Sequence, residues 1–300
     1  MSAGAVLVAG VLDATVREPP LRLHPVRAIG RYQDRASAVV PSQPPRRAVL
    51  AGGLAWGTGA AVSLLAAAAV ERVVRDAPPG RRALVLGVAL WPLLSGRMLL
   101  DEVRAVDHAL TVDLDAGRTA VARIVSRDVD GLSESEVRQA ALESLAENLS
   151  DSVVAPLFWY ACGGLPAAAL YRFANTADAT WGYRTPRWRH AGTVAARADD
   201  LFNLVPARLT GVALAGPGSS RRLRREARRT PSPNAGWPMA GLALRLGVRL
   251  EKRGAYTLHS AGRRPTAADT AAALRLAHRC VWASIVSAAV GSGLRRRRRR

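Results

Sequence analysis

AVLAGGLAWGTGAAVSLLAAAAV, residues 48–70, is an uninterrupted apolar run of 23 residues that contains no charged side chain. A helix rises about 1.5 Å per residue, so this run can cross the hydrocarbon core of a bilayer, which is about 30 Å thick. The run therefore predicts a membrane-spanning helix and places the chain among membrane proteins.

Further apolar segments lie on both sides of this run. The candidates for additional membrane segments are residues 1–14, 83–100, 152–171, 201–216 and 280–294. The first follows no Lys or Arg and precedes no small-residue cleavage site, so we interpret it as a membrane helix rather than a signal peptide. No stretch alternates convincingly with period two. We therefore predict an all-α, polytopic helical membrane protein, with one domain over residues 1–294 and a basic tail at 295–300.

Residues 152–171 are uncharged, but Gly163, Gly164 and Pro166 interrupt them in the middle. Glycine and proline break helices, so this segment is either a spanning helix or a broken, re-entrant hairpin. A single crossing would place the polar motifs before and after it on opposite faces of the membrane. We expect the hairpin, because it brings these motifs to the same side.

The formal charge of +20 would by itself suggest a nucleic-acid-binding protein. The arginines cluster between the apolar runs, however, as they do in cytoplasmic loops of membrane proteins, and no zinc-finger, homeodomain or RNP-type pattern occurs. The composition, 49% hydrophobic but only 5% aromatic, suits close-packed membrane helices. We therefore expect no nucleic-acid partner. A basic nucleic-acid-binding protein is the alternative to this interpretation.

Residues 101–150 have the pattern of amphipathic helices on the cytoplasmic side. Ser133 and Glu136 form the S-x-x-E pattern of a capping box, so a helix is expected to begin there and to run through Asn148. The two cysteines, Cys162 and Cys280, lie far apart in apolar surroundings, which favours free thiols over a disulfide or metal site.

Acidic side chains gather next to the apolar segment at 152–171. Glu143, Glu147 and Asp151 are four residues apart, so they share one face if the segment is helical. Three like charges in a row repel one another unless cations neutralise them. Mg²⁺ is a suitable cation, because it binds carboxylate oxygens. Asp199 and Asp200 form a second acidic pair. We expect these acids to converge on one polar cavity, without assigning which is a metal ligand and which a base.

Arginines near these acids are candidates for binding phosphate or carboxylate groups, because guanidinium groups match those oxyanions bidentately. Arg208 lies within an apolar segment, where an unpaired charge costs at least about 2.5 kcal/mol, so we expect a carboxylate or substrate partner for it. His24 is either a base, a phosphate ligand or a structural histidine. Residues 232–236 are expected to form a turn whose N–H groups face an anion, with Asn234 able to adopt αL geometry.

The polar clusters follow one another in an order that resembles a known family. They are LHPVRAIGR (23–31), SRD (126–128), ESLAENLSD (143–151), APLF (155–158), YRFANTADATWGYR (171–184), ARADDLFNLVPARLT (196–210) and SPNAGWP (232–238). This order is similar to that of the CobD/CbiB family of cobalamin biosynthesis, the membrane-bound adenosylcobinamide-phosphate synthases. The resemblance extends from His24 to Pro238.

The resemblance implies an amide-forming ligase that joins aminopropanol or its phosphate to the free propionate carboxyl of adenosylcobyric acid. It also implies ATP and Mg²⁺, although the chain contains no G-x-x-x-x-G-K-[ST] loop and no G-x-G-x-x-G unit. The expected location is the cell membrane, with several spans and an active site facing the cytoplasm, where other cobalamin-pathway enzymes could deliver substrate. The chain departs from the family pattern at Val129, Ser152 and Glu18-Pro19, which affects substrate preference more than the reaction.

The site residues expected from the resemblance and from the polar clusters form three sets. The catalytic set is Glu143, Glu147, Asn148, Asp178, Asp199 and Asp200. The substrate-binding set is His24, Ser126, Arg127, Asp128, Arg172, Asn175, Thr176, Tyr183, Arg184, Arg197, Asn203, Arg208, Ser232 and Asn234. The metal set is Glu143, Glu147 and Asp151. The alternative from another class is a non-enzymatic membrane sensor or regulator on a related helical scaffold.

Overall fold

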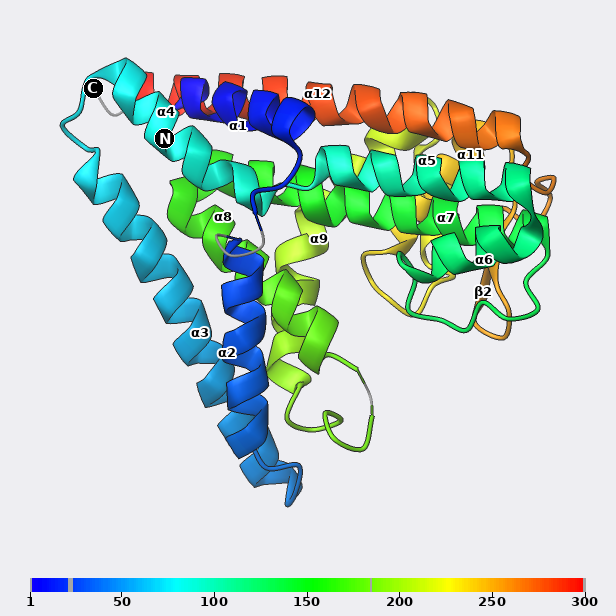
Figure 1. Cartoon of the computed structure of the whole chain (residues 1–300), viewed down its shortest axis with the longest axis horizontal. Coiled ribbons are helices and arrows are strands. Elements are labelled where there is room, and N and C mark those ends of the chain that lie inside the picture. The colour runs from blue at the N-terminus through cyan, green and yellow to red at the C-terminus, as the bar shows by residue number, and fades with distance from the viewer. Residues whose placement is uncertain (1, 21–23, 184, 299–300) are drawn as a thin grey trace. The chain divides into compact units, whose positions relative to one another are not determined.

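The computed structural model describes residues 2–20, 24–183 and 185–298, and it is built almost entirely from helices (Figure 1). The chain divides into two compact units. Unit 1 comprises residues 1–95, 155–202 and 284–300, and unit 2 comprises residues 96–154 and 203–283. The prediction of an all-α fold is confirmed.

Unit 1 is a bundle of helices around an aromatic core. Its elements are α1 (Ala3–Val16), α2 (Pro25–Val39), α3 (Pro45–Val73), α4 (Pro79–Leu90), the 3₁₀ turn η1 (Trp91–Leu93), α8 (Ala155–Trp181), the start of α9 (Thr193–Ala215) and the end of α12 (Ala267–Arg298). Helix α1 packs on α4, and α8 packs on α2 and α3. Buried Phe173 and Trp181 of α8 contact Tyr32 of α2, which fixes α2 against α8.

Three helical stretches are long and apolar enough to cross a membrane among the described residues: Pro45–Val73, Pro79–Val112 and Glu134–Trp181. The first contains the predicted span at residues 48–70, and only 17% of its most apolar window is buried inside the protein. Helix α1 is apolar but has 14 residues, a length of about 21 Å at 1.5 Å per residue. The segments at residues 1–14, 201–216 and 280–294 remain predictions as membrane spans.

The predicted interruption of residues 152–171 lies inside α8. Gly163 and Gly164 have non-helical dihedral angles, and Gly164 has a φ of 73°, which favours glycine. The break exposes the backbone N–H of Leu165 at the start of the next helical part. Glu71 of α3 accepts a hydrogen bond from this N–H at 2.9 Å, so a carboxylate from another helix caps the restarted helix.

The apolar segment at residues 83–100 is also not one continuous helix. Helix α4 ends at Leu90, η1 follows, and α5 begins at Gly96. Pro92 lies at the start of η1 and has no N–H to continue the helical hydrogen bonds. The break therefore lies at Trp91–Ser95, and the charged residue of the segment, Arg97, lies inside α5.

Unit 2 is organised around a central buried helix, α7 (Glu134–Leu149). The other elements are α5 (Gly96–Val112), α6 (Leu114–Ala122), the π-helical turn η2 (Ser150–Val154), α10 (Ser220–Ala227), α11 (Gly236–Leu246), β1 (Leu250–Lys252), β2 (Tyr256–Leu258), and parts of α9 and α12. The predicted capping box is present at Ser133 and Glu136. Helix α7 contacts α5, α6, α11 and β1, so every residue from Val137 to Ala146 is buried.

A short antiparallel hairpin, β1–β2, was not expected from the sequence. Its register pairs Leu250 with Leu258 and Lys252 with Tyr256. Gly254 in the connecting turn has a φ of 72°, a conformation that glycine adopts without strain. Each strand has only three residues, too few to show a period-two pattern.

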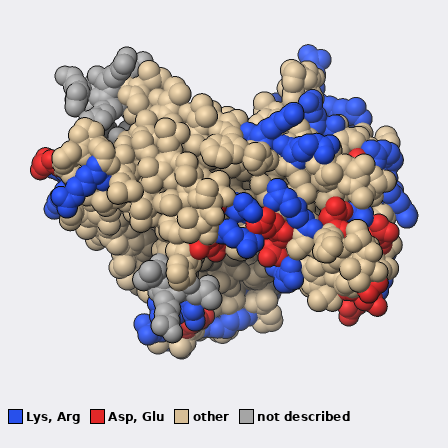
Figure 2. All heavy atoms as spheres, turned by 45° about the horizontal axis from the view of Figure 1, so that its top comes forward, with Lys and Arg blue, Asp and Glu red and all other residues tan. Residues whose placement is uncertain are grey.

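The surface separates charged and uncharged areas. On the face drawn in Figure 2, Lys and Arg side chains gather in groups, and wide areas carry no charged side chain. Cys162 and Cys280 are both free thiols, as predicted. Helix α10 contains four arginines, and its exposed face is basic while Leu223 and Ala227 are buried.

Candidate functional site

A cluster of ionisable groups in unit 2 is centred on Glu143 of α7. Its side chain is only 5% exposed, and it forms an ion pair with Arg127, which lies in the loop after α6. Tyr256 of the hairpin also interacts electrostatically with this carboxylate. Helix α7 therefore presents a predicted catalytic acid to a predicted substrate-binding arginine.

The hairpin adds two residues that the sequence analysis missed. Lys252 interacts electrostatically with Glu143, and Tyr256 with both Glu143 and Glu147. Burial, and then the neighbouring Glu143 carboxylate, raise the pKa of Tyr256. Glu147 is exposed, one turn beyond buried Glu143. The cluster thus combines two acids, two cations and a hydroxyl that stays protonated at neutral pH.

Ser144 of α7 holds the start of the loop that carries Arg127, and three predicted residues lie around this contact. The Asn148 amide donates to the Ser144 carbonyl at 3.0 Å, and the Ser144 hydroxyl donates to the Ile124 carbonyl at 2.8 Å. Ser126 and Asp128 are exposed on either side of Arg127. Asp151 is half-buried in η2, where the π-helical turn changes the i, i+4 register assumed for the three acids.

A second polar group in unit 2 contains Arg208 of α9. Its guanidinium donates to the Asn234 side-chain oxygen at 3.1 Å and to the Leu204 carbonyl at 2.6 Å, and it stacks over Trp237 at 4.9 Å. The side-chain partner of Arg208 is therefore an amide and not the expected carboxylate. The turn just before α11 supplies this amide, Asn234.

The turn at residues 232–236 also differs from the expectation. The Ser232 hydroxyl accepts hydrogen bonds from the N–H groups of Asn234 at 3.2 Å and Ala235 at 3.1 Å. These two N–H groups therefore bind a side chain of the same turn. Asn234 does not have a positive φ. Asn203, a predicted substrate-binding residue, is buried near the start of the α9 part of this unit.

In unit 1, a polar group connects the loop before α2 to other elements. His24 Nε2 and Glu18 Oε2 are 3.4 Å apart, and the Ser95 hydroxyl donates to Glu18 Oε1 at 2.9 Å. The hydrogen bond from His24 holds the pKa of Glu18 below its usual value, with Ser95 and Arg172 acting in the same direction against burial. His24 also caps α2 through Nδ1, which accepts from the Val26 N–H. This finding favours the structural interpretation of His24.

The other predicted residues of unit 1 lie along α8 and the start of α9. Asn175 donates to the Asp199 carboxylate at 3.2 Å, which joins the two helices. The Thr176 hydroxyl donates to the Arg172 carbonyl, and Asp178 is half-buried on the same helix. Burial raises the pKa of Asp200, although Arg197 opposes the shift. Arg197 and Tyr183 are exposed, and Arg184 lies outside the described residues.

The predicted site residues thus form groups within each unit. The expectation that all of them share one cavity stays a prediction. Among the described residues, no three His, Cys, Asp or Glu side chains gather as a metal site would require. The three-carboxylate metal set also stays a prediction, with Glu143 bound to Arg127.

Comparisons with known proteins identify one family. The model of the CobD/Cbib protein family matches residues 6–281. A probable cobalamin biosynthesis protein CobD from Methanothermobacter thermautotrophicus is 37% identical over 84% of this chain and 85% of its own length. The cobalamin biosynthesis proteins CobD from Brucella suis and Rhodobacter capsulatus are 38% and 50% identical, over 80% and 56% of this chain and 79% and 55% of their own lengths. No solved structure matches the chain.

Proposed function

Because the chain belongs to the CobD/CbiB protein family, we propose that it acts in cobalamin biosynthesis as a membrane-bound amide ligase. The proposed reaction joins aminopropanol or its phosphate to the free propionate carboxyl of adenosylcobyric acid. The Glu143 cluster is the observation that carries this proposal. It combines a buried, ion-paired acid with exposed Glu147 and cations from two other segments of unit 2.

Amide formation needs an electrophilic carboxyl group and an amine that has lost its proton. Glu147 is exposed and is the acid we assign to accept that proton. Arg127 and Lys252 supply positive charge for an anionic substrate, and the Arg127 guanidinium is fixed by Glu143. Tyr256 keeps its proton and is positioned to donate a hydrogen bond. Buried Glu143 therefore orients the site rather than reacting in it.

Magnesium would fit Asp151 better than Glu143, because Glu143 already neutralises Arg127 and Glu147 is assigned to the proton transfer. Magnesium usually binds one or two protein carboxylates and completes its shell with phosphate oxygens and water, so one acid suffices. ATP would supply the phosphoryl group that activates the carboxyl. No step assigned to the residues above depends on how ATP binds.

The test is turnover by the purified protein in detergent. The protein is supplied with adenosylcobyric acid, ATP, Mg²⁺ and either aminopropanol or its phosphate, and the product is followed by mass. We expect the mass of the amide with at least one amine. Glu147→Gln should reduce the rate by about 10²–10⁴-fold, as for loss of a general base. Asp115→Asn changes a carboxylate that is 86% exposed in the same unit, and it should leave the rate unchanged.

The same experiment separates the alternatives. No amide with either amine, in protein that still binds adenosylcobyric acid, would favour the membrane sensor. Equal rates for Glu147→Gln and the unchanged protein would remove Glu147 from the site. The nucleic-acid-binding alternative predicts a soluble protein, which three apolar helices of spanning length argue against.

A further inference from the structure

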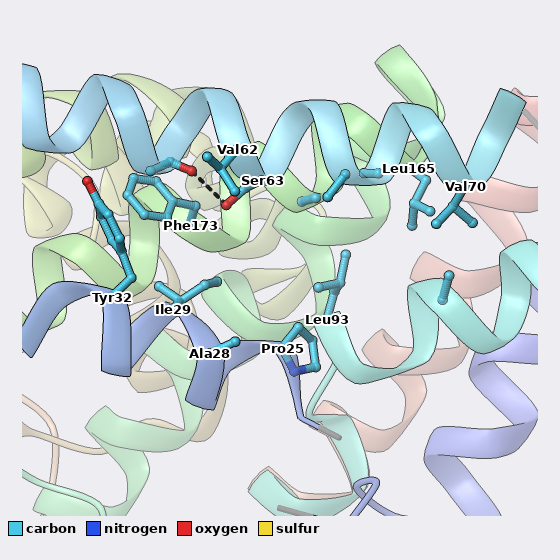
Figure 3. Close-up of a pocket in the computed structure, with 15 residues that line it drawn as sticks. Pro25, Ala28, Ile29, Tyr32, Val62, Ser63, Val70, Leu93, Leu165 and Phe173 are labelled. Atoms are coloured by element: carbon cyan, nitrogen blue, oxygen red, sulfur yellow. Dashed lines mark hydrogen bonds between the residues drawn. The ribbon is translucent and has the colours of Figure 1, made fainter. Parts of the chain in front are cut away.

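Unit 1 contains an apolar groove whose lining includes none of the site residues described above. It has a volume of about 350 Å³ and is bounded by α2, α3, α8 and the end of α4 with η1. Figure 3 shows Ile29 and Tyr32 of α2 on one side and Val62 and Val70 of α3 on the other, with Leu93 and Phe173 also against it.

The side chains that line the groove offer no unused hydrogen-bond donor to an occupant. No charged side chain lines it. Its two side-chain hydroxyls are already used, because Tyr32 donates to the Ala55 carbonyl at 2.5 Å and Ser63 donates to the Gly59 carbonyl at 2.9 Å (Figure 3). Such a lining favours a hydrocarbon occupant, because a polar group placed there would lose its hydrogen bonds to water without replacing them.

The groove follows the helix that is best suited to contact lipid. Its lining on α3 extends from Gly59 to Val70, a rise of about 16 Å at 1.5 Å per residue. Half of a hydrocarbon core measures about 15 Å, close to the reach of one extended acyl chain. Helix α3 is apolar, and most of its apolar window is not covered by protein.

Helix α2 also carries three exposed arginines. Arg27, Arg31 and Arg35 are four residues apart and form one row on the face next to that of the lining residues Ala28 and Tyr32, about 100° around the helix. Asp34 is exposed near the same row, so these four side chains carry a net charge of +2. Such a row is stabilised by an anion, and the phosphates of anionic lipids bind basic side chains at the membrane surface.

We propose that this groove binds an anionic phospholipid, with one acyl chain between α2 and α3 and the phosphate at the arginine row. The site is independent of the Glu143 cluster, which belongs to unit 2. The lipid would complete the packing of α2 against α3.

The test compares lipids retained by the purified protein. Delipidated protein is incubated in detergent with equal amounts of phosphatidylglycerol and phosphatidylcholine, and bound lipids are counted by native mass spectrometry. Ala66→Trp places a large ring in the groove. The matched control is Leu65→Trp, on the same helix at a position that is 63% exposed and outside the lining.

We expect the unchanged protein and Leu65→Trp to retain phosphatidylglycerol preferentially. Ala66→Trp should reduce its retention about tenfold, as expected when about two methylene groups lose their burial. Arg27→Gln combined with Arg31→Gln should reduce the preference for phosphatidylglycerol about fivefold per arginine, while phosphatidylcholine retention is unchanged.

Three results would overturn the proposal. Equal retention of the two lipids by the unchanged protein would remove the role of the arginines. Equal lipid counts for Ala66→Trp and Leu65→Trp would place the lipid elsewhere. A lipid-free dimer that Ala66→Trp converts to monomers would show that a second copy fills the groove. None of these readouts depends on turnover.

Discussion

Tyr256 connects the hairpin to the acids of α7 through one hydroxyl group. Its side chain is half-buried, and its hydroxyl donates to Met239 Sδ at 3.6 Å and interacts electrostatically with the Glu143 carboxylate. Tyr256→Phe removes only the oxygen, so we expect an intact fold that loses about 1 kcal/mol of stability and about 10- to 100-fold in amide formation. Product mass and thermal unfolding measure both effects. Thr111→Val, which removes an exposed hydroxyl of α5 in the same unit, should change neither.

The ion pair of Glu143 with Arg127 can be tested by a double-mutant cycle. Arg127→Gln leaves a carboxylate that is 5% exposed without its cation, a change that costs about 3–5 kcal/mol when a buried pair is broken. Glu143→Gln should cost less, because Arg127 is 17% exposed and reaches water. The double variant has neither charge and should be more stable than Arg127→Gln. Unfolding followed by tryptophan fluorescence gives the four values, and strict additivity would contradict the pairing.

Asp269 gives a pH-dependent contribution at the start of α12. Its carboxylate accepts hydrogen bonds from Arg263 at 2.5 and 2.7 Å and from the Thr266 N–H at 2.8 Å. The hydrogen bonds from Arg263 are the main cause that lowers the pKa of Asp269 from 3.8 to about 2. A lowered folded pKa stabilises the protein above pH 3.8, and this contribution is lost as the pH falls toward 2.

The contribution is about 2 kcal/mol at 1.36 kcal/mol per pKa unit, before screening at exposed Arg263 reduces it. Asp269→Asn should therefore lower the unfolding free energy at pH 7 and flatten its pH dependence between pH 4 and 2. An unchanged acid-unfolding profile would show that Asp269 does not titrate as described.

The break in α8 depends on a glycine and on a carboxylate from α3. A Cβ at Gly164 would collide with Glu71 Oε1, and the φ of 73° is strained for any other residue. Gly164→Ala should lower stability by about 1–2 kcal/mol or more, and Glu71→Gln should be milder because the amide oxygen still accepts from Leu165. Gly57→Ala, in α3 with open space around it, is the control. Thermal unfolding in detergent ranks the variants, and equal losses at both glycines would rule out the described break.

Local signals were enough to predict several of these elements. The pair Ser133 and Glu136 marks the start of α7, and the two adjacent glycines mark the break in α8. Both signals act through backbone hydrogen bonds within a few residues. The span at residues 48–70 was predictable for the same reason, since apolar length alone decides it.

Contacts between distant segments were not predictable in this way. Tyr256 and Glu143 are more than a hundred residues apart, and nothing in the sequence around either one specifies the other. The spacing of Glu143 and Glu147 predicted that the two acids share one face of α7. It did not predict that Glu143 is buried and Glu147 exposed, because that difference depends on how the Arg127 loop and the hairpin pack on α7. The apolar sequence around Arg208 likewise predicted that this arginine has a partner. It did not identify the partner as Asn234, which the turn before α11 brings to Arg208.

The whole protein combines helices of spanning length with strongly basic connecting segments. The family match covers residues 6–281, so elements of both units belong to the matched region. The excess of arginine in α10 predicts that this part of unit 2 faces the cytoplasm, because positively charged segments are retained on that side. An active site near the hairpin would then open to the cytoplasm.

This orientation can be measured at Ser260, an exposed position just after the hairpin. Arg222 of α10 lies 3.0 Å from His259, so Ser260 and the basic helix must lie on the same side of the membrane. With Cys162 and Cys280 replaced by Ala, Ser260→Cys should react with a membrane-impermeant maleimide in inside-out vesicles and not in right-side-out vesicles. Detergent-solubilised protein should react fully and serves as the control. Labelling in right-side-out vesicles would place the hairpin outside the cell, where neither ATP nor a cytoplasmic corrinoid could reach the Glu143 cluster.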